Sequence, residues 1–243
     1  MHQAGILKIN SVYKQFKRSI NHSMTANSSP NIEIKPTATK QVTGSQALLD
    51  ALIQEGVKTI FGYPGGAIMP VYDALYDYND RLEHILVRHE QGAIHAAQGF
   101  ARVSGKTGVV FATSGPGATN LVTGLADAMI DSTPVVCITG QVFAHLLGTD
   151  AFQETDVINI TTPVTKWSYQ VTNAEEIPHV LAKAFYIAST GRPGLVVIDI
   201  TKNAQLQLFD YEGYQKCFHI RSYKPKPEVR PAYIAEAAAI INE

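Results

Sequence analysis

Between Val42 and Ile200, short apolar runs alternate with longer segments in which apolar and polar residues are mixed. The apolar runs predict strands at 59–61, 84–87, 108–113, 135–139 and 195–200. The mixed segments predict helices at 45–56, 67–79, 90–103, 121–131 and 175–189. Ser45 is a suitable N-cap for the first helix, and Gly56 is a suitable stop.

These strands are apolar throughout rather than alternately apolar and polar, which is typical of a sheet covered by helices on both faces. Strand and helix follow each other in turn, and this alternation favours parallel strands joined by crossover helices. The pattern therefore predicts an α/β fold with a doubly wound parallel sheet over residues 42–203.

The two ends of the chain depart from this pattern. Residues 1–41 are rich in Lys, Asn and Ser and contain a single acid, Glu33, which indicates a disordered or targeting-like extension. Residues 204–230 include the segment Lys-Pro-Lys-Pro and are predicted to form a linker. Residues 231–243 begin a helical pattern without a cap, so we expect the chain to be truncated at the start of a second α/β domain.

Composition narrows the classes of protein. The formal net charge is -1 and no basic patch is visible, so nucleic acid is not an expected partner. Cys137 and Cys217 lie far apart in the sequence, which favours a reducing compartment. No apolar stretch approaches the roughly 20 residues that a bilayer crossing needs, so a membrane is not expected either. We expect a bacterial cytoplasmic protein, with a plastid as the alternative.

Unusual residues follow four of the predicted strands, at 63–66, 88–91, 114–117 and 140–141. Because the carboxyl ends of parallel strands share one edge of a sheet, these segments should meet there. Glu90 is the main candidate for chemistry, since it begins a helix whose dipole favours a carboxylate and follows an apolar strand. The alternative for Glu90 is a structural acid paired with Arg88.

Other motifs with known chemistry do not fit. The glycine turns match neither a P-loop nor G-x-G-x-x-G, since Asn120 stands where the last glycine would be. A zinc motif H-E-x-x-H fails at Ala93, and no G-x-S-x-G elbow occurs. We expect no metal ligand among these residues, and a packing or surface role for His84, His89 and His95.

Five segments together resemble the acetohydroxyacid (acetolactate) synthase catalytic subunits, a family of thiamine-diphosphate enzymes. In order they are 63–67 (YPGGA), 88–93 (RHEQGA), 113–120 (TSGPGATN), 148–154 (GTDAFQE) and 165–167 (TKW). The second and third are shared by many thiamine-diphosphate enzymes, whereas the fourth and fifth are narrower and point to this synthase. The resemblance covers residues 42–203.

This resemblance implies an architecture and an activity. Residues 42–203 would be the pyrimidine-binding domain, and 231–243 would open a central FAD-binding domain. The cofactors would be thiamine diphosphate, FAD and Mg²⁺, with the metal ligands outside this chain.

The implied enzyme is a transferase that decarboxylates pyruvate and condenses the product with a second 2-oxoacid, pyruvate or 2-oxobutyrate, in the synthesis of valine, leucine and isoleucine. It would be a dimer or higher oligomer with active sites between chains, and the 243 residues alone would be inactive. The sequence leaves open whether a regulatory small subunit binds.

The resemblance also assigns residues. Glu90 would be catalytic, through a hydrogen bond to the aminopyrimidine ring of the cofactor. Cofactor contacts would come from Gly66, Ala67, Pro116, Asn120, Gln141 and, for FAD, Arg192. The substrate channel would be lined by Phe152, Gln153, Lys166 and Lys202. The alternatives are a different thiamine-diphosphate decarboxylase or oxidase, a non-catalytic cofactor-binding module, and a nucleotide-binding Rossmann protein.

Overall fold

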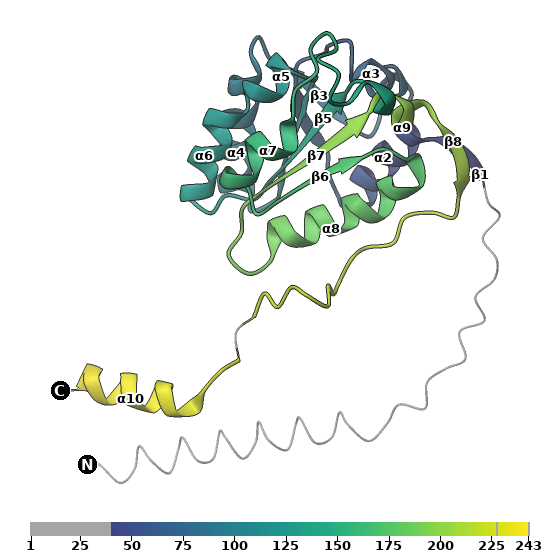
Figure 1. Cartoon of the computed structure of the whole chain (residues 1–243). Helices are drawn as coiled ribbons and strands as arrows, with labels where there is room; N and C mark the ends of the chain where they lie inside the picture. The colour runs from purple at the N-terminus through teal and green to yellow at the C-terminus, as the bar shows by residue number, and fades with distance from the viewer. Residues whose placement is uncertain (1–39, 227, 243) are drawn as a thin grey trace, which may run out of the picture. The chain divides into compact units, whose positions relative to one another are not determined.

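A computed structural model describes residues 40–226 and 228–242 (Figure 1). The strands are β1 (Lys40–Thr43), β2 (Thr59–Gly62), β3 (Glu83–Leu86), β4 (Gly108–Ala112), β5 (Val135–Gln141), β6 (Trp167–Val171), β7 (Leu195–Thr201) and β8 (Leu208–Tyr211). The α-helices are α2 (Gly44–Gln54), α3 (Met69–Leu75), α4 (Glu90–Ser104), α5 (Pro116–Thr119), α6 (Val122–Ile130), α7 (Val157–Thr161), α8 (Ile177–Ser189), α9 (Lys202–Leu206) and α10 (Pro231–Asn242). Short 3-10 helices occur at Tyr76–Tyr78, Ala144–Leu146, Thr162–Val164 and Ala174–Glu176.

The main sheet has six strands in the order β3-β2-β4-β5-β7-β6, and every neighbouring pair is parallel. From β2 the chain crosses outward to β3, whereas from β4 it crosses in the opposite direction to β5. The switch point of the topology therefore lies between β2 and β4, where doubly wound folds bind ligands. A separate antiparallel pair joins β1 to β8.

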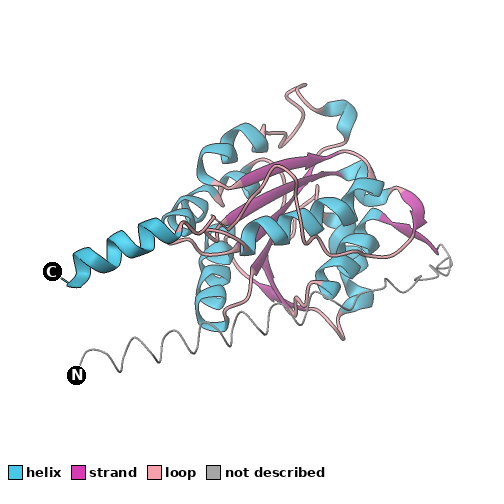
Figure 2. Ribbon diagram, turned by 90° about the horizontal axis from the view of Figure 1, so that it is seen from below, coloured by secondary structure: helices cyan, strands magenta, loops and turns pink. Residues whose placement is uncertain are grey.

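Helices cover both faces of this sheet (Figure 2). On one face, α2, α3, α8 and α9 pack over a core that includes Leu48, Phe111 and Ile198. On the other face, α4, α6 and α7 pack over a core that includes Ile94 and Cys137. The central strands β4, β5 and β7 are buried along their whole length, which explains why each is apolar throughout. The predicted doubly wound parallel sheet is confirmed.

The N-cap of the first helix lies two residues earlier than the sequence predicted. Its N-cap is Thr43, whose hydroxyl accepts from the Gln46 amide while the Gln46 side chain accepts from the Thr43 amide. This capping box satisfies two amides at the helix start. Ser45, the predicted cap, is buried and donates instead to the carbonyl of Gln205 at 3.0 Å. The predicted stop is correct, since Gly56 follows the C-cap in the left-handed region.

Sequence reasoning missed strands β1, β6 and β8. The strand β6 carries Trp167, Ser168 and Gln170 rather than an apolar run, because it is the last strand of the sheet and is only half-buried. The strand β8 falls inside the predicted linker at 204–230, yet it pairs with β1 and buries Phe209. The folded unit therefore continues beyond residue 203, the expected boundary.

The remaining expectations concern the ends of the chain. Residues 231–242 form helix α10, as the pattern predicted, and its apolar side chains Tyr233, Ile234, Ile240 and Ile241 are exposed. Apart from Lys40 and Gln41 in β1, the extension predicted at 1–41 lies outside the described residues.

Two helical glycines provide a test of this packing. An added Cβ at Gly124 in α6 would lie 2.1 Å from Cγ2 of buried Ile94 in α4, whereas at Gly99 in α4 it would meet no atom within 4 Å. We expect Gly124→Ala to lower the free energy of unfolding by about 1–3 kcal/mol through overpacking. Gly99→Ala should raise it by about 0.5–1 kcal/mol through helix propensity. Urea denaturation of both variants checks this, and equal effects at the two sites would contradict the packing of α6 on α4.

Candidate active site

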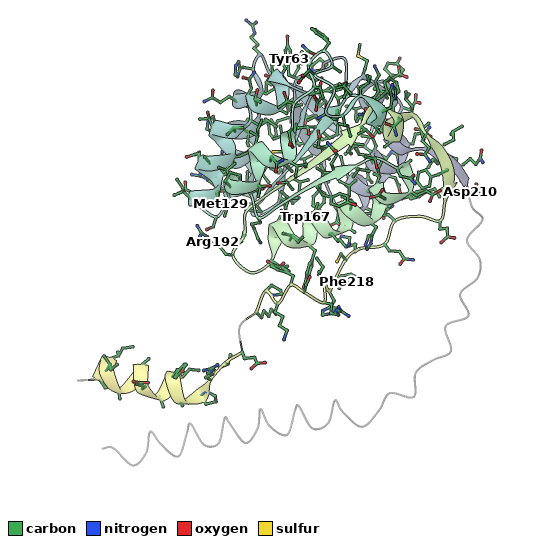
Figure 3. All side chains as sticks on the ribbon, viewed as in Figure 1. Tyr63, Met129, Trp167, Arg192, Asp210 and Phe218 are labelled. Carbon is green, nitrogen blue, oxygen red and sulfur yellow. The ribbon has the colours of Figure 1, made fainter. Side chains whose placement is uncertain are left out.

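Three turns meet at the carboxyl edge of the sheet, at the switch point of its topology. They are residues 63–66 after β2, residues 87–89 after β3 and residues 113–115 after β4. The expected meeting of these segments is confirmed by the parallel pairing of the three strands. Figure 3 shows Tyr63 of the first turn at this edge, and Trp167 and Arg192 toward the other end of the strands.

Glu90 is the first residue of α4, and its side chain is buried, with 7% of its surface exposed. The side-chain amide of Asn120 donates a hydrogen bond of 2.9 Å to its Oε2. Within the described residues no hydrogen bond reaches Oε1, and none of the ion pairs joins Glu90 to Arg88. The helix dipole favours a negative charge at this position. The carboxylate is therefore held by one oxygen and has the other available.

Thr113 connects the turns around Glu90. It is buried after β4, and its hydroxyl accepts a 3.3 Å hydrogen bond from the Ala67 amide. An added Cβ at Gly65 would lie 2.5 Å from Thr113, and one at Gly117 would lie 2.7 Å from Thr113 and 3.3 Å from Oε1 of Glu90. These two glycines are thus required for close packing of the turns. Gly66 differs, because it is exposed and its Cβ would meet no atom within 4 Å.

The turn at Gly66 and Ala67 is fixed by its carbonyl groups. The Lys202 ammonium donates to the carbonyl of Gly66 at 3.1 Å. The side-chain amide of buried Gln205 donates to the carbonyls of Ala67 and Ile200, and its Oε1 has no partner within the described residues. Sequence reasoning included Lys202 but missed Gln205, because it was placed in the linker.

The segment 148–156 lies beside the turn that leads into α5. Asp150 and Gln153 have φ of 54° and 60°, a conformation that non-glycine residues rarely adopt. The carbonyl oxygen of Gln153 would lie 2.5 Å from a Cβ on Gly115, so the backbone of Gln153 is packed against that turn. Phe152 points to solvent, with 87% of its side chain exposed. This segment therefore borders the turn that precedes Pro116 and Asn120.

Gln141 and Asp199 form a buried polar network beneath this edge. The Asp199 carboxyl accepts from the hydroxyl of Thr139 at 2.6 Å and from the amides of Gln170 at 2.9 Å and Gln141 at 3.1 Å. Gln141 also donates to the carbonyl of Thr155 and accepts from the amide of Val142. Its amide group is thus fully used by the protein. Sequence reasoning predicted a cofactor contact for Gln141 and missed Asp199, which stands inside an apolar run.

Burial raises the pKa of Asp199 from 3.8 to about 6, although hydrogen bonds from Thr139, Gln170 and Gln141 oppose this rise. The nearby carboxylate of Asp156 raises it further. No cation faces Asp199 among the groups that shift its pKa. The carboxyl group therefore changes its charge near pH 6 inside the core.

Lys166 and Arg192 lie at the other edge of the sheet. Lys166 precedes β6, and its ammonium donates to the carbonyls of Ile187 and Thr190 near the end of α8. Arg192 precedes β7 and donates to Ser132 at 2.7 Å and to the carbonyls of Met129 and Ile130. Both cations therefore satisfy carbonyl groups at the C-terminal ends of helices, where positive charge is favoured. Within this chain, the structure does not bring either of them to Glu90.

The three histidines have structural contacts. Nε2 of His84 lies 3.0 Å from the hydroxyl of Tyr72, and the ring of His89 accepts from the Gln91 amide as the N-cap of α4. His95 lies 3.7 Å from Asp127 on the surface. Within the described residues, no group of three or more His, Cys, Asp or Glu side chains could hold a metal ion.

The fold and this site place the chain in a known class. Residues 42–160 match the family described as thiamine pyrophosphate enzyme, N-terminal TPP binding domain. This region contains all three turns, Glu90 and Asn120. The chain therefore belongs to the thiamine pyrophosphate enzymes.

Within that class, the chain is similar to acetolactate synthase large subunits. The chain is 53% identical over 204 residues to the acetolactate synthase large subunit of Mycobacterium tuberculosis, covering 84% of this chain and 33% of the relative. It is 56% identical over 191 residues to the isozyme 2 large subunit of Escherichia coli, covering 79% and 34%. It is 54% identical over 202 residues to a probable large subunit of Methanocaldococcus jannaschii, covering 82% and 34%. The chain thus spans about a third of the length of these relatives.

None of the helices in the described part of the chain combines the length and the apolar character that a membrane crossing requires.

Asp199→Asn tests the charge of the buried network. Because the pKa of Asp199 is about 6 in the folded chain and 3.8 ordinarily, folding favours the protonated form, and the cost of burying the charge grows as pH rises from about 4 to 6. The neutral variant avoids that cost. At pH 7.5 we expect it to be more stable than the wild type, by at most about 3 kcal/mol. The difference should disappear near pH 4. Denaturant unfolding at pH 4, 6 and 7.5 measures this, and a pH-independent difference would contradict it.

Proposed function

We propose that this chain provides the pyrimidine-binding domain of an acetolactate synthase, a transferase that decarboxylates pyruvate and joins the product to a second 2-oxoacid. The observation that carries this proposal is the carboxylate of Glu90, which is buried at the start of α4. Its Oε2 is bonded to Asn120, and its Oε1 has no hydrogen bond to any of the described residues. The identity of about 50% to acetolactate synthase large subunits supports the choice of reaction.

The residues at this edge fit the aminopyrimidine part of thiamine diphosphate. When bound, the cofactor supplies an electron sink for decarboxylation. The Oε1 atom of Glu90 would hold the pyrimidine ring through a hydrogen bond to a ring nitrogen, where a partly desolvated carboxylate can take up or release a proton. Asn120 holds the other oxygen, so the carboxylate cannot rotate away. The open surface at Gly66 admits a ligand next to the backbone. We assign further cofactor contacts to Ala67, which follows Gly66, and to Pro116 at the start of α5.

Lys202 and the segment that contains Phe152 and Gln153 belong to the same proposal. The Lys202 ammonium lies beside the Gly66 carbonyl, where its positive charge favours the carboxylate of a 2-oxoacid. Phe152 is exposed in the segment that borders the Gly115 turn. We assign both to the substrate route. We place Lys166 in that route only through a neighbouring chain, since here it faces the other edge.

A dimer or higher oligomer, with the site between chains, is part of the proposal. Exposed apolar side chains surround the carboxyl edge: Met69 is 56% exposed, Leu86 is 65% exposed and Phe152 is 87% exposed. An apolar surface of this kind is typical of an interface.

The name "large subunit" given to the relatives supports a small regulatory subunit as a further partner. We propose Mg²⁺ and FAD as additional cofactors, with the metal held outside the described residues, and a bacterial cytoplasm, or alternatively a plastid, as the location.

Glu90→Gln tests the central role. The variant keeps the size of the side chain but removes the group that exchanges the proton, so acetolactate formation should fall by about 100-fold or more. Its melting temperature should stay close to that of the wild type. The protein is expressed from its complete gene and assayed with pyruvate, thiamine diphosphate, Mg²⁺ and FAD. Glu175→Gln, a change of an exposed acid at another helix start, serves as the control and should be fully active.

Two outcomes would change the assignment. Near-normal acetolactate formation by Glu90→Gln would remove Glu90 from catalysis. Production of acetaldehyde or acetate without acetolactate by the wild type would instead favour a decarboxylase or oxidase of the same class. A protein that binds the cofactor and turns over no 2-oxoacid would favour a binding module.

Arg192→Ala separates two roles of this arginine. Its bonds to the carbonyls of Met129 and Ile130 predict a loss of about 1–2 kcal/mol of stability. If the side chain also contacts FAD, as we propose, the Kd for FAD measured by flavin fluorescence should rise about tenfold. Ser132→Ala removes one partner of Arg192 without the cation, so it should reduce stability and leave FAD binding unchanged. An unchanged FAD affinity in Arg192→Ala would leave this arginine a purely structural residue.

A further inference from the structure

We propose that Asp199 is a positioning residue that orients the side-chain amide of Gln141, and through it anchors the segment 148–156 beside the Glu90 site. The inference rests on the proposed function only in its link to catalysis. The anchoring itself follows from the hydrogen bonds and packing of the described residues.

The network is built by the register of the sheet. Thr139 on β5 and Gln170 on β6 are both direct partners of Asp199 on β7. Gln141 stands two residues beyond Thr139 on the same strand, so its side chain lies on the same face. Three donors from two neighbouring strands therefore converge on one carboxyl group that is fully buried.

Asp199 determines the direction in which the Gln141 amide points. One N–H of Gln141 donates to Asp199 and the other donates to the carbonyl of Thr155 at 2.9 Å. Its Oε1 accepts from the amide of Val142 at 2.9 Å. All polar hydrogens of the Gln141 side chain are thus used. Without the acceptor on Asp199, this amide would lose the bond that holds it toward Thr155.

The segment that ends at Thr155 needs such an anchor. Asp150 and Gln153 both have positive φ, which is a strained conformation for residues other than glycine. The segment contains no regular helix or strand between residues 148 and 156. Its tip is held to the rest of the domain where the carbonyl of Gln153 meets Gly115. The Gly115 turn leads into α5 and to Asn120, which bonds Glu90.

Asp199 faces three neutral hydrogen-bond donors and one acidic side chain. On β5 and β6 its partners are the neutral side chains of Thr139, Gln141 and Gln170. On the segment before α7, Asp156 is the acid that acts on it. A neutral group with the shape of Asp can keep all three bonds, because Asn accepts from both glutamines through Oδ1 and donates to the hydroxyl of Thr139 through Nδ2.

Three variants test the proposal in the protein expressed from its complete gene. Asp199→Ala removes the acceptor, Asp199→Asn keeps it, and Gln170→Ala removes a donor of the same network that does not touch the segment. Hydrogen exchange is followed at the amides of Gly148 and Glu154, which are hydrogen-bonded within the segment. Rates are normalised to core amides of β5, so that a general loss of stability cancels.

We expect these amides to exchange about tenfold faster in Asp199→Ala and at the wild-type rate in Asp199→Asn and Gln170→Ala. In the acetolactate assay, kcat should fall in Asp199→Ala while KM for pyruvate changes little, and Asp199→Asn should restore kcat. Equal exchange of the segment in Asp199→Ala and Gln170→Ala would overturn the proposal. If the wild type forms no acetolactate, the proposed function fails, and the exchange rates still decide whether Asp199 anchors the segment.

Discussion

Burial of the Glu90 carboxylate is the constraint on which the carboxyl edge of the sheet depends. A carboxylate removed from water needs hydrogen-bond donors or a favourable dipole. Here the N-terminus of α4 supplies the dipole. Asn120, which follows α5 after the Gly115 turn, donates the hydrogen bond. Thr113 and the glycines at 65 and 117 allow the turns to approach closely enough for this contact. The geometry of three strand ends is therefore set by one charged group.

Much of this arrangement could be predicted from the sequence. Strands β4, β5 and β7 are apolar throughout because helices cover both their faces, and such runs are visible without a structure. Glu90 was also visible, since it follows the strand predicted at 84–87 and begins a helix. Edge strand β6 was not, because four of its five residues are only half-buried and it carries polar side chains instead of an apolar run. Strand β8 was hidden by its distance in sequence from β1, its only partner in the described sheet.

The polar network around Asp199 shows why the rest of the site escaped prediction. A single acid within Leu-Val-Val-Ile-Asp-Ile-Thr gives no local sign of its partners, which depend on the order and register of three strands. The opposite difficulty applies to Lys166 and Arg192. Both stand in segments typical of the family, yet each precedes a strand, and parallel pairing then carries it away from Glu90. A residue that follows its strand lies at the edge of Glu90, and a residue that precedes its strand lies at the opposite edge. The two kinds of residue can be told apart only when the sheet topology is known.

The two buried carboxyl groups differ in how many of their oxygens the protein uses, and this difference separates their roles. Both oxygens of Asp199 are bonded, by three donors, so a ligand can gain nothing from it without breaking a protein contact. Among the described residues, Glu90 has one oxygen bonded and one without a hydrogen bond, so it can interact with a ligand while it remains held in place. Desolvation acts on both groups, but only an available oxygen can exchange a proton with a bound ring. At the same physical cost of burial, the protein thus leaves one oxygen open to a ligand in Glu90 and uses both oxygens in Asp199.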